Sequence, residues 1–184
     1  MKTEAINRKV AEPYAEALMA LAEEQNLVEA ISADVQAIIS AVSNSPELAR
    51  FLASPVMGDT LKKQVLGQVL GGLQPLTLNF LGLLVDRDRI AFVLDICTQF
   101  QALYRQTKNI AFAQVTTATP LTDAQTDTLR QRVMGLTGAG AVELEITVDP
   151  SLIGGVSIRV GSQIIDASIR GQLRRISSRL LASV

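Results

Sequence analysis

The stretch of residues 154–176, GGVSIRVGSQIIDASIRGQLRRI, holds four glycines and four arginines, residue types that bind phosphate when their spacing is right. A phosphate-binding loop needs a Lys-Ser or Lys-Thr pair after its glycines, at the start of a helix, so that backbone amides and an ammonium meet the phosphates together. Here no lysine follows, and residues 156–160 alternate apolar and polar side chains as a β-strand does. The glycines therefore indicate the turns of a hairpin, and we expect no nucleotide or other cofactor.

Catalytic chemistry has few other candidates in the chain. There is no histidine, so proton transfer would fall to carboxylates, lysine or tyrosine. The nearest paired acids, Asp86 and Asp88, stand in the polar segment VDRDRI, which is typical of a break between two helices. The single cysteine, Cys97, lies among apolar residues and is expected to be buried in a helix. Without histidine or a CxxC motif we expect no zinc site, and we predict a protein that is not an enzyme.

The composition favours packed helices that keep some apolar surface for a partner. Of the 184 residues, 48% are hydrophobic but only 4% are aromatic, and the mean hydropathy is +0.27. A monomer of this size has limited interior in which to bury so much apolar surface. The first residues, MKTEAINRKVAEPYAEAL, lack the apolar core and cleavage site of a secretion signal, so we expect a protein on the cytosolic side of a membrane.

An uncharged window of 22 residues, 64–85, is long enough to cross a bilayer. Five polar side chains, the pair Gly71-Gly72 and Pro75 interrupt it. We therefore predict two amphipathic helices here and no direct membrane span.

Residues 1–107 are predicted to form a six-helix bundle with short turns, because apolar residues recur at helical spacing between breaks such as SNSP and SPVMGDT. Pro13 is expected in the opening turn of the first helix, since proline is poorly tolerated inside one. Pro46 can occupy the first position of the third helix after a Ser45 cap.

Residues 108–184 are predicted to form a small α/β domain, which makes the fold mainly α overall. Thr122 and Gln125 have the spacing of a capping box at the start of a helix, and residues 142–149 alternate as a strand with one buried face. Gly161-Ser162 is expected to be the turn of a β-hairpin. A closing helix follows, and we expect its apolar residues to dock on the sheet: Ile169, Leu173, Ile176, Leu180 and Leu181.

The arginines of the closing helix could in principle contact nucleic acid. However, residues 108–184 have 8 basic and 6 acidic side chains, and residues 1–107 have a net charge of −3. The small basic excess of residues 108–184 is far below the strong positive charge of a nucleic-acid-binding surface. No aromatic residues lie between the arginines to stack on bases. We predict no nucleic-acid binding and expect this surface to face an acidic protein partner or solvent.

The second half also resembles a known family. Residues 142–161 resemble the signature of the delta subunit of F-type ATP synthases, whose mitochondrial relative is the oligomycin-sensitivity-conferring protein. The resemblance continues through IIDASIRGQLRRI, and PYAEAL near the amino terminus is similar to the family's first helix. The matching positions in the signature are Val142, Leu144, Val148, Asp149, Leu152, Gly154, Gly155, Val156, Ile158, Arg159 and Gly161.

The resemblance implies a non-catalytic stator subunit that joins the alpha3beta3 catalytic head to the peripheral stalk, so that rotor torque is coupled to ATP synthesis. Residues 1–107 would take up the amino-terminal helix of an alpha subunit between the first and fifth helices, and residues 108–184 would bind the b and b′ stalk subunits. The complex would place the chain peripherally on the cytoplasmic or stromal face of an energy-coupling membrane such as the thylakoid, beside other ATP synthase subunits. The implied groove residues are Tyr14, Ala17 and Leu18 on the first helix and Phe80, Leu83 and Leu84 on the fifth.

Five residues of the second half are expected to be either stalk-facing or structural: Gly154, Gly155, Asp166, Arg170 and Arg174. For the glycines and Asp166 the structural role is favoured, as a special backbone conformation and a helix cap. The alternative for the whole chain is a basic adaptor or regulatory protein that binds an acidic partner or nucleic acid.

Overall fold

The computed structural model describes residues 2–182, and the side chains of residue 7 and residues 9–178. The chain forms two compact units, Met1–Tyr104 and Arg105–Val184. The division falls in the last turn of helix α6 (Val93–Thr107). Arg105 belongs with the second unit because its guanidinium donates to Glu143 over 3.1 Å and lies 4.4 Å from the ring centre of Phe112.

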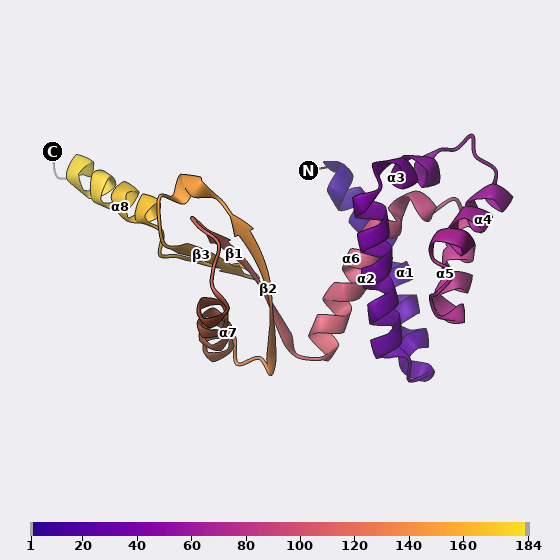
Figure 1. Cartoon of the computed structure of the whole chain (residues 1–184), viewed down its shortest axis with the longest axis horizontal. Helices are drawn as coiled ribbons and strands as arrows, with labels where there is room; N and C mark the ends of the chain where they lie inside the picture. The colour runs from indigo at the N-terminus through magenta and orange to yellow at the C-terminus, as the bar shows by residue number, and fades with distance from the viewer. Residues whose placement is uncertain (1, 183–184) are drawn as a thin grey trace. The chain divides into compact units, whose positions relative to one another are not determined.

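Unit 1 is built from helices joined by short turns (Figure 1). Apolar residues at helical spacing on each helix meet in one core, which includes Leu18, Ile31, Leu52, Leu84 and Phe100. The elements are α1 (Lys2–Glu24), α2 (Val28–Asn44), α3 (Pro46–Ala53), α4 (Asp59–Val69), α5 (Pro75–Asp86), the 3-10 turn η1 (Ile90–Phe92) and α6.

Two prolines show how far local sequence rules reach in this unit. Pro46 does occupy the first turn of α3, and the Ser45 hydroxyl accepts a hydrogen bond from the Leu48 amide over 3.2 Å, as predicted. The prediction for Pro13 was wrong, because α1 begins at Lys2 and Pro13 lies inside it. A proline removes one backbone hydrogen bond, and the core contacts of Ala11, Ala15 and Leu18 on either side hold the helix together across that gap.

Unit 2 is a four-stranded mixed sheet with a helix on one face and a closing helix. The strand order is β2-β1-β3-β4. Strands β1 and β2 run parallel and are joined through α7, while β3 is antiparallel to both β1 and β4. The elements are β1 (Ile110–Thr117), α7 (Asp123–Thr137), β2 (Ala141–Val148), the 3-10 turn η2 (Pro150–Leu152), β3 (Val156–Val160), β4 (Gln163–Asp166) and α8 (Ile169–Ala182).

Local signals in this unit are confirmed. The Thr122 hydroxyl accepts from the Gln125 amide and the Gln125 side chain accepts from the Thr122 amide, which completes the capping box of α7. Gly161 takes a φ of +56° in the β3–β4 turn, a conformation that favours glycine. The fold is therefore mainly helical, with a small four-stranded sheet and a carboxy-terminal closing helix.

One face of the sheet is covered by α7 and forms a small core. Ala113, Val115, Ile158 and Val133 are almost fully buried there. The coverage stops before the end of β2, where Ile146 and Val148 are 39% and 45% exposed. In the described residues the apolar face of the sheet thus continues beyond the helix that covers it.

Helix α8 does not dock on the sheet, which contradicts the expectation from its pattern. Ile169, Leu173 and Ile176 are 44%, 54% and 55% exposed, and α8 runs beyond the end of the strands (Figure 1). At the base of its first turn, the amide of Ile169 donates to the Gly154 carbonyl over 3.0 Å. The side chains of Leu180 and Leu181 lie outside the described residues.

Candidate partner-binding surfaces

Helix α5 presents one exposed apolar residue beside α4. Leu83 is 44% exposed and lines a hollow of about 580 Å³ between the two helices. Leu66 and Gly67 form the α4 wall, and the ion pair Lys63–Asp86 joins the two walls over 2.5 Å. Asp86, at the end of α5, thus pairs with a lysine of the neighbouring helix.

The six groove residues expected from the resemblance are not brought together in this hollow. Leu18 and Leu84 are buried in the core of unit 1, so they can support a groove but cannot line one in this conformation. Tyr14 and Phe80 are half-buried against the same core, and Ala17 is exposed on α1. Leu83 and Ala17 are therefore the two members of the set most open to a partner.

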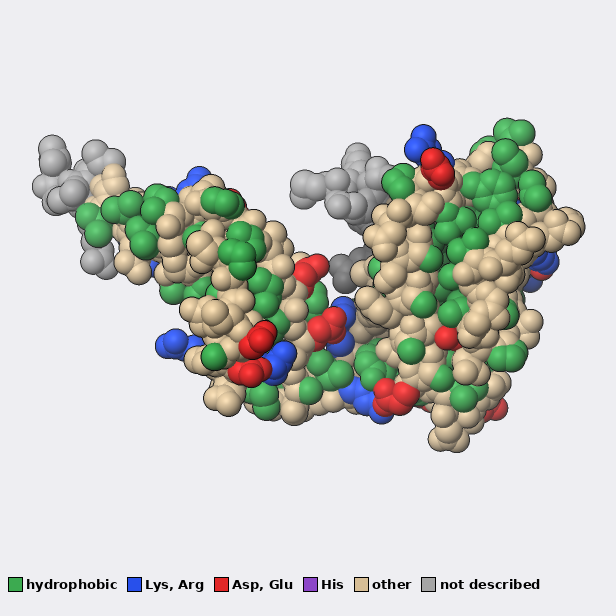
Figure 2. All heavy atoms as spheres, viewed as in Figure 1, with side chains coloured by type: hydrophobic (Ala, Val, Ile, Leu, Met, Phe, Trp, Pro, Cys, Tyr) green, Lys and Arg blue, Asp and Glu red, His purple; other side chains and the backbone are tan. Residues whose placement is uncertain are grey.

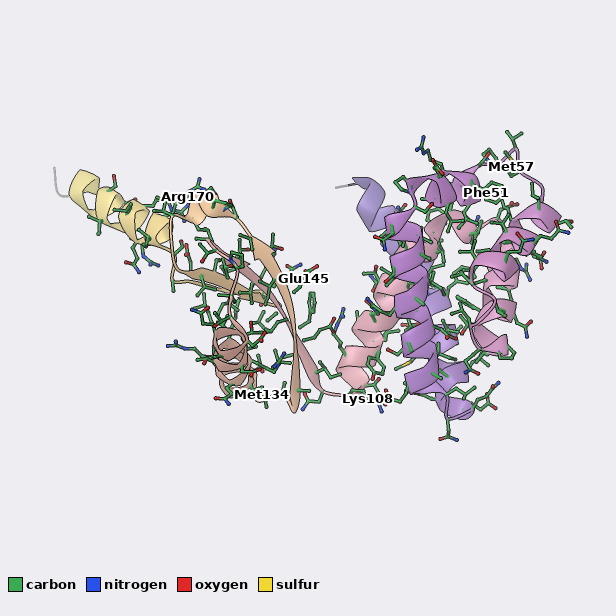
Figure 3. The ribbon with its side chains drawn as sticks, in the orientation of Figure 1. Phe51, Met57, Lys108, Met134, Glu145 and Arg170 are labelled. Carbon is green, nitrogen blue, oxygen red and sulfur yellow. The ribbon has the colours of Figure 1, made fainter. Side chains whose placement is uncertain are left out.

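A second apolar surface of unit 1 lies at the turn between α3 and α4. Val56, Met57 and Leu61 are 87%, 39% and 46% exposed. Figure 2 shows apolar side chains gathered at this end and along the face between α2 and α5, and Figure 3 places Phe51 and Met57 at the same end. Sequence analysis missed this surface because the turn SPVMGDT was read only as a break.

In unit 2 the carboxylate of Asp166 fixes the start of α8. Its Oδ1 accepts hydrogen bonds from the amide and the hydroxyl of Ser168, over 2.9 and 2.6 Å. The Ser168 hydroxyl in turn accepts from the amide of Gly171 over 3.0 Å, which caps the helix. These bonds from Ser168, together with the more distant Arg175 and Arg174, hold the pKa of Asp166 below its ordinary value.

Gly155 and Gly171, near the start of α8, leave no room for a larger side chain at this corner. A Cβ atom on Gly155, where φ is +77°, would lie 2.4 Å from the Ala167 carbonyl oxygen, and one on Gly171 would lie 2.3 Å from Asp166 Oδ2. At Gly154 it would meet the end of the Ile169 side chain at 2.6 Å. Gly155 and Gly171 therefore have a steric reason to be glycine that involves no partner, whereas at Gly154 the flexible end of the Ile169 side chain could move aside.

The two arginines of the expected site differ in their surroundings. Arg170 donates to the Ser151 hydroxyl over 3.0 Å at the base of α8 (Figure 3). The same hydroxyl donates to Asp149 over 2.9 Å, and the amide and hydroxyl of Ser151 lower the pKa of Asp149. Arg174 is exposed and lines a small hollow with Asp166 and Arg170. Arg170 thus ties α8 to η2, while Arg174 faces solvent.

Within the described part of the chain no group of three or more cysteine, aspartate or glutamate side chains could hold a metal ion. No helix between residues 2 and 182 has the length and apolar character needed to cross a bilayer. What the two units do present are exposed apolar surfaces on helices, which are typical of proteins that bind other proteins.

Comparison with known proteins identifies the family. The model of the ATP synthase delta (OSCP) subunit family matches residues 10–180. The chain is 50% identical over 181 residues to ATP synthase subunit delta of a Synechocystis strain and 46% identical over 181 residues to that of Gloeothece citriformis, with 98% of each chain covered. A chain in the cryo-EM structure of the Toxoplasma gondii mitochondrial ATP synthase hexamer matches with a TM-score of 0.77 at 27% identity, covering 93% of this chain and 97% of that one. The chain belongs to the ATP synthase delta (OSCP) family.

Proposed function

We propose that this chain is a non-catalytic stator subunit that joins the catalytic head of an F-type ATP synthase to its peripheral stalk. The observation that carries the proposal is the near full-length match to subunits named ATP synthase subunit delta, together with a fold in two units that each present a separate apolar surface. A connector between two bodies needs two such surfaces and no reaction centre. The chain would act peripherally at the cytoplasmic or stromal face of an energy-coupling membrane.

Unit 1, with α1–α6 as the six-helix bundle, is the proposed attachment to the head. The amino-terminal helix of an alpha subunit is an amphipathic ligand that would place apolar anchors three and four residues apart against the bundle. Leu83 is the α5 residue that such an anchor can reach, and Ala17 leaves space for close approach on α1. Tyr14 and Phe80 would contact the ligand with their exposed parts, while Leu18 and Leu84 would anchor α1 and α5 in the core beneath the groove.

Unit 2 is the proposed attachment to the b-type stalk subunits. The exposed apolar residues of α8 recur at intervals of four and three residues, the spacing at which one helix packs along another. Arg174 and Arg175 lie beside this row and would pair with acidic residues of a stalk helix. Such an arrangement favours an acidic helical partner over nucleic acid, since no aromatic platform accompanies the arginines.

The head attachment is tested with a peptide of the Synechocystis alpha-subunit amino terminus, titrated into the full chain by calorimetry. Because Leu83 is partly exposed, Leu83→Asp should leave the circular dichroism spectrum unchanged and weaken binding at least tenfold by placing a charge in the apolar contact. Val69→Asp is the matched control, because Val69 is 52% exposed on α4 and does not line the hollow of Leu83. Wild-type affinity in Leu83→Asp would remove the α5 assignment.

A further inference from the structure

An apolar groove in unit 2 remains without an assigned role. It has a volume of about 540 Å³ and runs between the first turns of α7, the end of β1 and residues 153–156. Its walls are mainly small and aliphatic, and they include Thr117, Ala124, Ile153 and Gly154. A volume of this size accommodates one or two large apolar side chains from a partner.

Thr117, at the end of β1, gives the groove a hydroxyl group that lacks a hydrogen-bond partner in the described part of the chain. The residue is 1% exposed, and among the described residues its Oγ1 atom has no hydrogen-bond partner. A buried hydroxyl without a partner lowers the stability of a fold, and nearly all buried polar groups are paired. Valine would fill the same space at no such cost, so a threonine here is better explained by an acceptor that arrives from outside.

Ile153 marks the rim of the same groove with an unusual backbone. Its φ is +67° and its ψ is −38°, although a β-branched residue disfavours positive φ. Its side chain is 65% exposed, so burial within the chain does not compensate for this strain. Residues held in this way cluster at binding sites, where a partner contributes the missing contacts.

The groove is continuous with the exposed apolar row of α8. Gly154 lines the groove, and the Ile169 side chain, the first member of the row, reaches within 2.6 Å of the position that a Gly154 Cβ would occupy. One helix that packs along Ile169, Leu173 and Ile176 would therefore meet the groove at its end. The arginines beside the row select for a partner with acidic flanks.

We infer that this groove is the anchor pocket for the stalk helix: an acidic amphipathic helix packs along α8 and inserts an apolar side chain between α7 and Ile153, while the Thr117 hydroxyl donates a hydrogen bond to a backbone carbonyl oxygen of the inserted segment. The inference rests on the proposed attachment of unit 2 to the stalk and adds a second contact to it. It also suits a small residue at Gly154, because a Cβ atom there would meet the Ile169 side chain where the groove and the α8 row come together.

The test uses the full chain and the soluble portions of the Synechocystis b and b′ subunits, with affinity measured by calorimetry and stability by thermal unfolding. Thr117→Val removes only the hydroxyl and should weaken binding about three- to tenfold, while the unfolding temperature stays the same or rises. Ala124→Trp fills the groove and should weaken binding more than tenfold. Arg130→Trp, on the same helix but outside the groove lining, is the control and should bind within twofold of wild type.

The opposite signs of the Thr117→Val effects distinguish a contact from a purely structural role, which would change stability and leave affinity untouched. Wild-type affinity in both Thr117→Val and Ala124→Trp overturns the pocket while leaving the stalk attachment in place. Failure of the wild-type chain to bind the b and b′ portions overturns the stalk attachment and the pocket together.

Discussion

Asp34, on α2, accepts a hydrogen bond from the hydroxyl of Thr77, on α5, over 2.6 Å, and the same Oδ2 atom accepts the amide of Gln74 over 2.9 Å. Gln74 is the cap residue of α5 and its own side chain makes no capping bond. A carboxylate from another helix thus does the work of a local cap and also faces the positive end of the helix dipole. The position of α5, and of Leu83 on it, depends on this contact.

Removal of the Asp34 carboxylate should destabilise unit 1. Asp34→Ala leaves the fully buried Thr77 hydroxyl and the Gln74 amide without an acceptor, and we expect a loss of about 2 to 3 kcal/mol in the free energy of unfolding. Asp34→Asn keeps an acceptor and should cost less. Urea unfolding measures the loss, and faster hydrogen exchange at the start of α5 locates it. Asp59→Ala, an exposed acid in the first turn of α4, should change stability by less than about 0.5 kcal/mol.

The pH dependence of unit 2 should contain a contribution from Asp166. Its pKa in the folded state is lowered, so the ionised group stabilises the fold above the ordinary pKa of aspartate, about 4, and this contribution disappears as the pH falls through the folded value. Asp166→Asn lacks this titration. The stability difference between wild type and Asp166→Asn should therefore shrink between pH 7 and pH 3. A difference that stays constant over this range would contradict the role of the carboxylate.

Gly155 and Gly161 form a matched pair for substitution. Both have positive φ, but a Cβ atom on Gly155 would meet the Ala167 carbonyl, whereas one on Gly161 meets nothing within 4 Å. Gly161→Ala should cost about 1 kcal/mol from backbone strain alone, and Gly155→Ala should cost at least about 2 kcal/mol more because of the clash. Urea unfolding of both variants checks this order. Equal losses would show that the corner can open to accept a methyl group.

The apolar row on α8 should matter for binding and little for folding. Leu173→Ser and Ile176→Ser remove side chains that are more than half exposed, so the free energy of unfolding should change by less than about 0.5 kcal/mol. Affinity for the b and b′ portions should fall at least tenfold in each variant. Gln172→Ser, an exposed neighbour on the same helix, should bind as wild type does. A large loss of stability would instead mean that α8 docks within its own chain.

Cys97 should be unreactive until unit 1 unfolds. The residue is 3% exposed, and burial raises the pKa of its thiol to about 12, so almost no thiolate exists at pH 8. A thiol reagent such as dithionitrobenzoate should modify the folded chain very slowly and the urea-unfolded chain within seconds. Rapid modification of Cys97 in the folded protein would contradict the burial of its side chain in α6.

Local signals predicted much of the fold. The Ser45 and Thr122 caps and the hairpin at Gly161 each involve residues a few positions apart, and each is confirmed. The alternation of residues 142–149 predicted the strand β2 but not its burial, because the strand consists of partly buried and exposed residues only. Proline inside α1 shows the limit, because the contacts that maintain that helix come from other helices. Asp34 shows it again: it stood alone on the apolar face of α2, and only the fold reveals that the start of α5 lies opposite.

The candidate site was harder to predict for a related reason. An apolar row on a helix specifies that something covers it, but the row does not say whether its own core or a partner does so. Leu18 and Leu84 turned out to belong to the core, whereas Ile169, Leu173 and Ile176, expected to dock on the sheet, are exposed. The groove beside Thr117 joins residues from three separate segments, so no local pattern could have indicated it.

The exposed apolar row on α8 also affects how the subunit must be synthesised relative to its partners. A helix with apolar residues in open contact with water is a site of self-association, and copies made in excess of their partners would adhere to one another. Stoichiometric synthesis alongside the other subunits would keep this surface occupied from the start. Solubility on overproduction should accordingly improve when the stalk portions are produced together with the chain.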